Sequence, residues 1–173
     1  LYKRYTKEIV PSLKTELKLK SVMQVPKVTK VVLNAGIGRF IKDAGYIDNV
    51  EKTLGKITGQ KPVRTKAKKA ISNFKIRHGQ EIGVIVTLRG KRMYQFLEKL
   101  VNVSFARIRD FRGITDKAFD RQGNYTLGLK ENTAFPEIKT GEIEKMHGLQ
   151  IVINISAKNK AEGKALLTHF GYP

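Results

Sequence analysis

The chain has 173 residues and no cysteine, and its 34 Lys and Arg against 15 Asp and Glu give a formal net charge of +19. The absence of cysteine excludes disulfides, thiolate metal sites and cysteine nucleophiles, while 40% hydrophobic residues argue against a disordered tail. The longest run without Asp, Glu, Lys or Arg, residues 146–157, is too short and too polar to span a bilayer, and no secretory signal opens the chain. We expect one domain over residues 1–173, preceded by a few further residues because the chain starts at Leu1 rather than Met.

The first half of the chain predicts a helix, a strand and a second helix. A helical stripe of apolar residues covers residues 2–19, although Pro11 is expected to break or kink that helix. Residues 28–34 alternate as a strand with one partly polar face. Asp43 is a predicted N-cap for a helix that runs to about Ile57. The inner face of this helix is predicted to carry Tyr46, Val50, Leu54 and Ile57.

The second half predicts four strands and two helices. After a short extended stretch at residues 60–65, SNFKI (72–76) and GVIVTLR (83–89) are predicted as strands joined through RHGQE. A core-facing helix is predicted at residues 91–102, followed by an irregular region at about 103–120. Two further strands are predicted at residues 124–130 and 149–156. Asn159 and Glu162 resemble a capping box for a last helix that ends near Gly171.

This element order favours an α+β fold. Adjacent strands with short connections indicate an antiparallel sheet, and helices packed mainly on one face would leave the other face open. A basic hairpin loop at about residues 72–82 is expected to protrude from the sheet.

The motifs of enzymes are missing or incomplete. The sequence GIGRFI (36–41) has a GxG after a strand but lacks the third glycine of a dinucleotide fingerprint, so we interpret it as a turn. The three His residues, His78, His147 and His169, show no metal-ligand spacing. We therefore expect no catalytic residues, no metal and no cofactor.

The positive charge is concentrated in one part of the chain. Residues 52–95 carry twelve Lys and Arg and one acid, whereas residues 101–145 carry eight basic and seven acidic residues. The segment 61–78 alone has seven Lys or Arg and no Asp or Glu. Seven phosphate contacts would give a log-log salt slope of about −5 for binding to RNA. No DNA-reading motif is present, and a polar sheet face with basic loops fits folded RNA better.

A set of segments, in order along the whole chain, resembles one family. The segments are MQVPKVTKVVLNAGIG (23–38), TGQKPVRTKAKKAISNFKIRHGQ (58–80), GVIVTLRGKRMYQFLEKL (83–100), RIRDFRG (107–113), FDRQGNYTLGLKE (119–131), FPEI (135–138) and ALLTHFGYP (165–173). Together they are similar to the large-subunit ribosomal protein five family, which binds 5S rRNA. The resemblance implies a structural, non-enzymatic role in the central protuberance of a cytoplasmic or organellar ribosome.

The resemblance also implies three groups of functional residues. The rRNA-binding group comprises Asn34, Gln60, Lys61, Arg64, Lys66, Lys68, Lys69, Thr87 and Arg89. The group expected to contact the peptidyl-site tRNA comprises Asn73, Lys75, Arg77, His78 and Gln80. An inter-subunit bridge to small-subunit ribosomal protein thirteen is expected to involve Arg109, Asp110 and Arg112. Further expected partners are 23S-type rRNA and neighbouring central-protuberance proteins, with no membrane and no homo-oligomer.

Two other functions remain as alternatives to the ribosomal scaffold. A free RNA chaperone or nucleoid-type protein would bind RNA weakly, without sequence preference, and only changes to Lys and Arg would matter. An RNA-modifying enzyme would need a nucleophile or metal constellation, and the sequence shows none.

Overall fold

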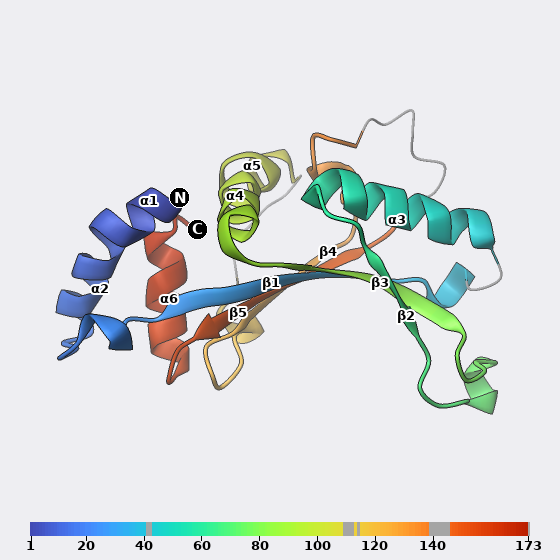
Figure 1. Cartoon of the computed structure of the whole chain (residues 1–173), viewed down its shortest axis with the longest axis horizontal. Helices are drawn as coiled ribbons and strands as arrows, with labels where there is room; N and C mark the ends of the chain where they lie inside the picture. The colour runs from blue at the N-terminus through green and yellow to red at the C-terminus, as the bar shows by residue number, and fades with distance from the viewer. Residues whose placement is uncertain (41–42, 109–112, 114, 139–145, 173) are drawn as a thin grey trace. The chain divides into compact units, whose positions relative to one another are not determined.

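The computed structural model describes residues 1–40, 43–108, 113, 115–138 and 146–172 (Figure 1). Contacts between residues divide the chain into two compact units. Unit 1 comprises residues 1–32, 88–127 and 152–173, and unit 2 comprises residues 33–87 and 128–151. The expected single domain over residues 1–173 stays a prediction.

The N-terminal helix of unit 1 accommodates Pro11 without ending. It consists of α1 (Tyr2–Arg4), the π-helical turn η1 (Tyr5–Ile9) and α2 (Val10–Glu16). Proline has no N–H and its ring clashes with the carbonyl of the preceding turn, so the wider π turn just before Pro11 relieves both problems. Ile9 and Leu13 of the predicted stripe are buried, whereas Tyr2 is largely exposed.

Two more helical segments complete unit 1. The first comprises α4 (Gly90–Lys99), the π-helical turn η5 (Leu100–Ser104) and α5 (Phe105–Arg107), so helical structure extends into the predicted irregular region. The second is α6 (Lys160–His169). Its predicted capping is confirmed, because the Asn159 side chain accepts a hydrogen bond from the Glu162 N–H at 2.9 Å. Glu162 in turn accepts one from the Lys158 N–H at 2.9 Å.

The five strands form an antiparallel sheet in the order β2-β3-β1-β5-β4, which confirms the predicted fold class. Their bounds are β1 (Lys27–Gly36), β2 (Val63–Lys66), β3 (Glu81–Leu88), β4 (Tyr125–Leu129) and β5 (Leu149–Ser156). Within β1, burial alternates from Val31 to Ala35, so Val31, Leu33 and Ala35 lie in the core while Asn34 is half-buried on the other face.

In unit 2 one helix covers one face of the strands. Asp43 caps α3 (Ala44–Thr58) through a hydrogen bond from the Tyr46 N–H at 3.1 Å, as predicted. All four predicted inner residues of α3 are buried, namely Tyr46, Val50, Leu54 and Ile57. The helix ends at Gly59, whose left-handed φ of 64° supplies a C-terminal stop.

The predicted strand at residues 72–76 is wrong. The chain there forms the 3₁₀ turn η4 (Ser72–Phe74), followed by Lys75 in the left-handed region with φ 54°. Beyond β2 and β3, the two arms are joined at Ala67 by backbone hydrogen bonds with Gly79 and Gln80, and nearer the end by an isolated bridge between Ile71 and Ile76. Phe74 is 70% exposed instead of facing a core.

The remaining short elements are 3₁₀ turns: η2 (Val22–Gln24), η3 (Gly38–Phe40), η6 (Asp116–Ala118) and η7 (Asn132–Ala134). Among the described residues, no helix is both long enough and apolar enough to cross a membrane.

Candidate nucleic-acid interface

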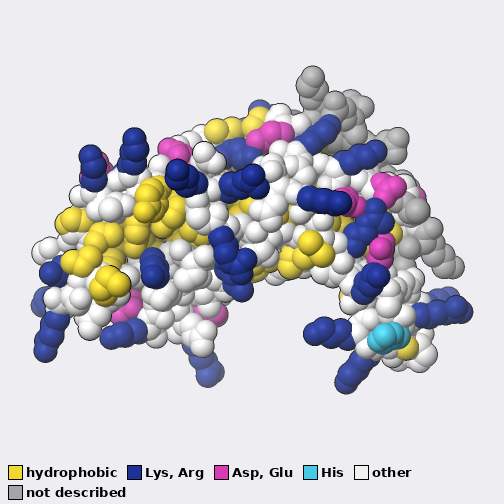
Figure 2. Space-filling view, viewed as in Figure 1, with side chains coloured by type: hydrophobic (Ala, Val, Ile, Leu, Met, Phe, Trp, Pro, Cys, Tyr) yellow, Lys and Arg dark blue, Asp and Glu magenta, His cyan; other side chains and the backbone are white. Residues whose placement is uncertain are grey.

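The β2–β3 hairpin carries the basic segment that the sequence singled out. Two backbone hydrogen bonds join the arms where the strands end and the loop begins. The Ala67 N–H donates to the Gln80 carbonyl at 2.8 Å, and the Gly79 N–H donates to the Ala67 carbonyl at 2.9 Å. The hairpin extends away from the other elements of unit 2 in Figure 1, and Figure 2 shows Lys and Arg side chains spreading around its end. The expected protruding basic hairpin is therefore present.

Six basic residues of this region are exposed, and none forms an ion pair with a described residue: Lys61, Lys66, Lys68, Lys69, Lys75 and Arg77. Positive side chains without nearby carboxylates raise the local positive potential, which attracts polyanions. His78 is also exposed, and the half-buried Gln80 uses its side-chain oxygen to accept a hydrogen bond from the Arg77 N–H at 3.0 Å. Asn73 is exposed on the 3₁₀ turn.

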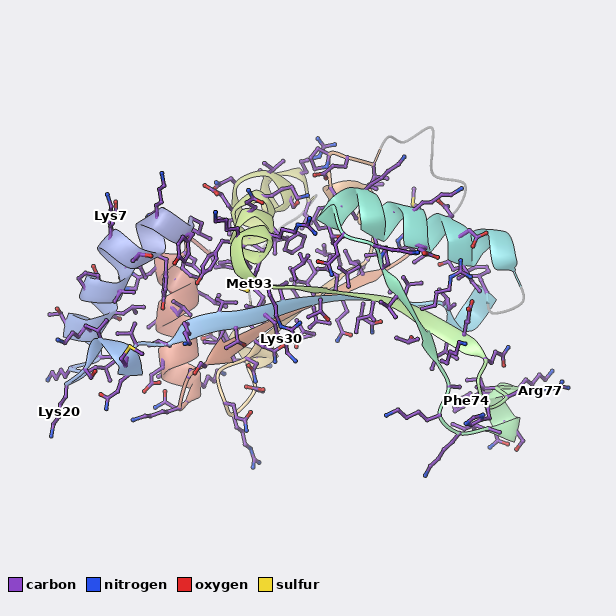
Figure 3. All side chains as sticks on the ribbon, in the orientation of Figure 1. Lys7, Lys20, Lys30, Phe74, Arg77 and Met93 are labelled. Carbon is purple, nitrogen blue, oxygen red and sulfur yellow. The ribbon has the colours of Figure 1, made fainter. Side chains whose placement is uncertain are left out.

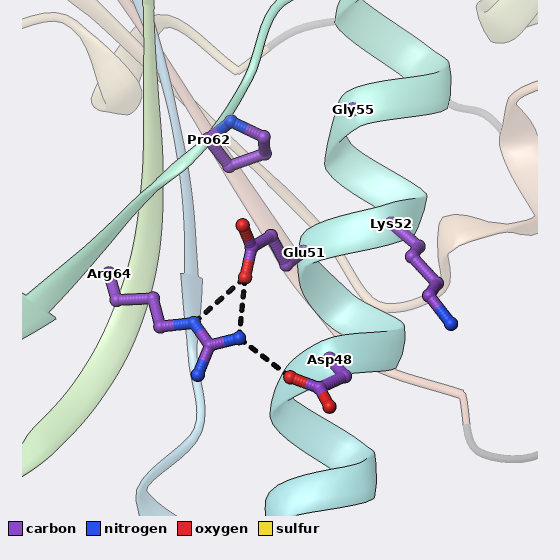
Figure 4. Close-up of a pocket in the computed structure, with 6 residues that line it drawn as sticks. All are labelled: Asp48, Glu51, Lys52, Gly55, Pro62 and Arg64. Carbon is purple, nitrogen blue, oxygen red and sulfur yellow. Dashed lines mark hydrogen bonds and ion pairs between the residues drawn. The ribbon is translucent and has the colours of Figure 1, made fainter.

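Arg64 differs from these six because three carboxylates hold its guanidinium, and two of them, those of Asp48 and Glu51, are drawn in Figure 4. It contacts Asp48 at 2.6 Å, Glu51 at 2.7 Å and Glu81 at 3.2 Å. The register of β2 with β3 places Arg64 opposite the buried Val84, so its side chain leaves the sheet on the face that α3 covers. The hydrogen bond to Glu51, followed by those to Glu81 and Asp48, raises the pKa of Arg64 above its ordinary value.

The geometry makes Arg64 a link between α3, β2 and β3. The shallow pocket beside it is lined by Asp48, Glu51, Lys52, Gly55, Pro62 and Arg64, and the charged groups of Asp48, Glu51 and Arg64 are used in this network. We therefore propose a structural role for Arg64 and not an RNA contact.

The other face of unit 2 presents polar side chains, two of which have no hydrogen-bond partner among the described residues. No hydrogen bond to a described residue engages the side chains of Asn34 on β1 or Thr87 on β3. Gln60, just beyond α3, donates its side-chain N–H to the Thr87 carbonyl at 3.1 Å. This bond joins two of the three predicted polar positions and leaves the Gln60 amide oxygen available for a ligand.

Thr65 and Gly83 belong to this face, although the sequence analysis did not identify them. The β2–β3 register pairs them, and a Cβ at Gly83 would lie 2.9 Å from the Thr65 hydroxyl oxygen and 3.7 Å from the Asn34 side-chain oxygen. The missing side chain thus lets Thr65 and Asn34 approach one point from two strands. Thr65 is half-buried and forms no side-chain hydrogen bond with another described residue, and neither property has a signature in the sequence.

The remaining predicted residues lie apart or outside the described residues. Arg89 is exposed at the N-cap of α4 and belongs to unit 1. Arg109, Asp110 and Arg112, predicted for the bridge, lie outside the described residues. Within the described ranges, no group of three or more His, Cys, Asp or Glu side chains is placed to hold a metal ion.

Comparisons with known proteins match this chain along nearly its whole length. The model of ribosomal protein L5 matches residues 21–77, and that of the C-terminus of the same ribosomal family matches residues 81–173.

Three curated relatives share more than half of their aligned residues with the chain. The large ribosomal subunit protein uL5 of Trichlorobacter lovleyi is 54% identical over 169 residues, which cover 98% of this chain and 94% of the relative. The protein of the same name from Brevibacillus brevis is 54% identical over 100% of this chain and 96% of its own. The protein of the same name from Acholeplasma laidlawii is 53% identical over 169 residues, which cover 98% of this chain and 94% of the relative. The chain therefore belongs to the ribosomal protein L5 family, also named uL5, which is a family of non-enzymatic proteins.

Proposed function

We propose that this chain binds 5S rRNA through the open face of unit 2 and the basic hairpin beside it. As a member of its family, the chain is a structural constituent of the large ribosomal subunit, with rRNA and ribosomal proteins as partners. The single observation that carries the proposal is the position of Asn34, Gln60 and Thr87. Asn34 and Thr87 lie on the sheet face opposite α3, and Gln60 is bonded to the Thr87 carbonyl. The same unit carries six exposed cations that form no ion pair with a described residue.

The two groups of residues have different roles in this proposal. The exposed Lys and Arg neutralise phosphates and position the RNA without reading its sequence. The amides of Asn34 and Gln60 and the hydroxyl of Thr87 form hydrogen bonds that only a matching RNA surface satisfies. Folded RNA offers such a surface through unpaired bases and 2′-hydroxyl groups.

The proposal is tested by separating these roles with single substitutions. We expect N34A, Q60A and T87V each to weaken binding to 5S rRNA by about 2- to 10-fold at fixed salt, because each removes about 0.5–1.5 kcal/mol of hydrogen bonding. Their log-log salt slopes should stay at the wild-type value. K68Q should instead reduce the slope by about 0.7, since it removes one phosphate contact.

The matched control is T168V on α6, whose hydroxyl is exposed and bonds only to the Lys164 carbonyl. It should bind 5S rRNA like the wild type. If all three open-face variants also bound like the wild type, the open face would have no part in recognition.

We further propose two finer contacts that rest on the family resemblance. The end of the hairpin, with Asn73, Lys75, Arg77, His78 and Gln80, contacts the peptidyl-site tRNA. Arg109, Asp110 and Arg112 take part in a bridge to small-subunit ribosomal protein thirteen.

Large subunits carrying R109E and R112E should associate more weakly with small subunits in sedimentation, and unchanged association would reject the bridge.

A further inference from the structure

Phe74 is the most exposed of the aromatic side chains that the structure describes. It is 70% exposed at the end of the hairpin, whereas Phe96, Phe105 and Phe170 are 2–4% exposed. Burying a phenylalanine side chain stabilises a protein by roughly 1.5–3 kcal/mol, and most of this gain is not realised at Phe74. No described residue forms a ring contact with it.

The backbone around Phe74 is closely tied. Ile71 and Ile76 exchange two backbone hydrogen bonds, of 2.9 and 3.1 Å, and the Lys75 N–H donates to the Ser72 carbonyl at 2.9 Å. Lys75 adopts a left-handed conformation that costs roughly 1–2 kcal/mol in a residue other than glycine. The hairpin therefore presents the ring on a defined turn, which lowers the entropy lost when a ligand binds.

The surroundings of Phe74 are cationic. Figure 3 shows Phe74 and Arg77 at the end of the hairpin, with the Arg77 side chain extending outward. Lys68, Lys69 and Lys75 are exposed in the same loop, and residues 61–78 contain no Asp or Glu. A protein partner that packed on Phe74 would need its own acidic rim. An RNA loop supplies phosphates for the cations and an unstacked base for the ring at the same time.

We propose that Phe74 is a stacking platform for an unpaired base in the loop of a folded RNA that the hairpin contacts. The inference rests on the proposed function, because it deepens the hairpin's contact with a second RNA beyond 5S rRNA. Stacking is not directional in the way a hydrogen bond is, so Phe74 contributes affinity for an exposed base of any identity.

The chain has no tryptophan, so F74W places a single fluorescent indole at the proposed contact. The F74W chain is first bound to labelled 5S rRNA, and the complex is then titrated with tRNA, whose loops contain unpaired bases. A fully paired RNA duplex of equal length and charge serves as the comparison. We expect tRNA to quench the indole emission through stacking, and the duplex to leave it nearly unchanged.

Substitutions at the same position separate stacking from hydrophobic contact. F74L keeps an apolar side chain without a π face and should weaken tRNA binding by about 5- to 150-fold, the range expected for one lost stacking contact. F74Y should bind like the wild type. The salt slope of F74L should equal that of the wild type, because no phosphate contact is removed.

The outcomes distinguish this inference from the function on which it rests. If the wild-type chain does not bind 5S rRNA, the proposed function fails. If 5S rRNA binds but F74L matches the wild type toward tRNA, or the duplex quenches F74W as strongly as tRNA does, only the stacking inference is overturned. Full quenching on addition of 5S rRNA alone would also overturn it, since the ring would then contact that RNA.

Discussion

Arg64 differs from the other basic residues of its segment because it has carboxylate partners within the chain. Its neighbours in sequence, Lys61 and Lys66, are exposed and form no ion pair with a described residue. Arg64 is surrounded by the carboxylates of Asp48, Glu51 and Glu81. The sequence alone could not separate it from the others, because two of the three carboxylates come from a helix that precedes it by 13 or more residues.

This difference predicts that removing the charge of Arg64 and removing that of Lys66 affect different properties, the first the melting temperature and the second the salt slope of RNA binding. R64Q should lower the melting temperature, since it leaves three neighbouring carboxylates without their shared cation, but it should not change the salt slope of 5S rRNA binding. K66Q should reduce that slope by about 0.7 and leave the melting temperature nearly unchanged. A reduced slope in R64Q would show that Arg64 does contact the RNA.

Asp120 gives a prediction for acid stability. Its carboxylate accepts hydrogen bonds from the backbone N–H groups of Gln122 and Asn124 at 2.9 and 2.7 Å, and from the Asn124 side chain at 2.7 Å. These bonds, first the one from the Asn124 side chain, lower the pKa of Asp120 from 3.8. Because the folded pKa lies below the unfolded one, the stabilisation is present above about pH 4 and is lost as the pH falls through the folded pKa.

We therefore expect D120N to melt about 1–3 °C below the wild type at pH 7. The gap should narrow as the pH is lowered toward 2, because protonation of Asp120 removes the charge-assisted hydrogen bonds that D120N also lacks. Circular dichroism melts at the two pH values measure this. Q122A is the control, since only the backbone of Gln122 takes part in the turn. A gap of equal size at pH 2 would contradict this account of the turn.

At the scale of elements, helix ends were more predictable than the hairpin. Asp43 and Asn159 cap α3 and α6 as the sequence indicated, because N-capping depends on residues only three positions apart. The strand predicted at residues 72–76 failed for the opposite reason. Its apolar alternation matched a strand, but Lys75 adopts a left-handed conformation that its residue type does not signal. Pro11 predicted an irregularity in the first helix but not that it would be a π turn, and the π turn that begins at Leu100 has no sequence signature here.

The packing of α6 predicts an unusual response to a helix-stabilising substitution. Alanine normally stabilises a helix interior by roughly 1 kcal/mol relative to glycine. A Cβ at Gly163, however, would lie 2.8 Å from the Cα of Gly123 and would clash with the Gly123 carbonyl. We expect G163A to lower the free energy of unfolding by about 1–3 kcal/mol, since the backbone must move to make room.

G55A is the matched control for this substitution. Gly55 lies inside α3, and its Cβ would meet Pro62 at 3.7 Å, an ordinary van der Waals contact. G55A should therefore raise the free energy of unfolding by about 0.5–1 kcal/mol in chemical denaturation. Stabilisation by both substitutions would show that the two glycine backbones are not in close contact.

At the scale of the whole molecule, the charge was the most reliable signal in the sequence. A net charge of +19 and its concentration between residues 52 and 95 indicated a polyanionic partner before any element was placed. The sequence did not reveal which polar groups stay unpaired in the folded chain. The structure identifies Thr65 beside Asn34. Arg64 is bonded to carboxylates, and Lys75 and Arg77 are proposed to contact tRNA, so four of the seven cations remain for 5S rRNA: Lys61, Lys66, Lys68 and Lys69. The expected log-log salt slope for 5S rRNA accordingly becomes about −3.

The most direct test of the central claim is a competition between 5S rRNA and a random RNA of equal length at about 150 mM salt, an ionic strength at which nonspecific phosphate contacts are weakened. Both RNAs offer the same number of phosphates, so the hairpin cations alone would bind them equally. We expect 5S rRNA to win, and its advantage to shrink in N34A and T87V. Equal affinity of the wild-type chain for the two RNAs would contradict recognition through the open face.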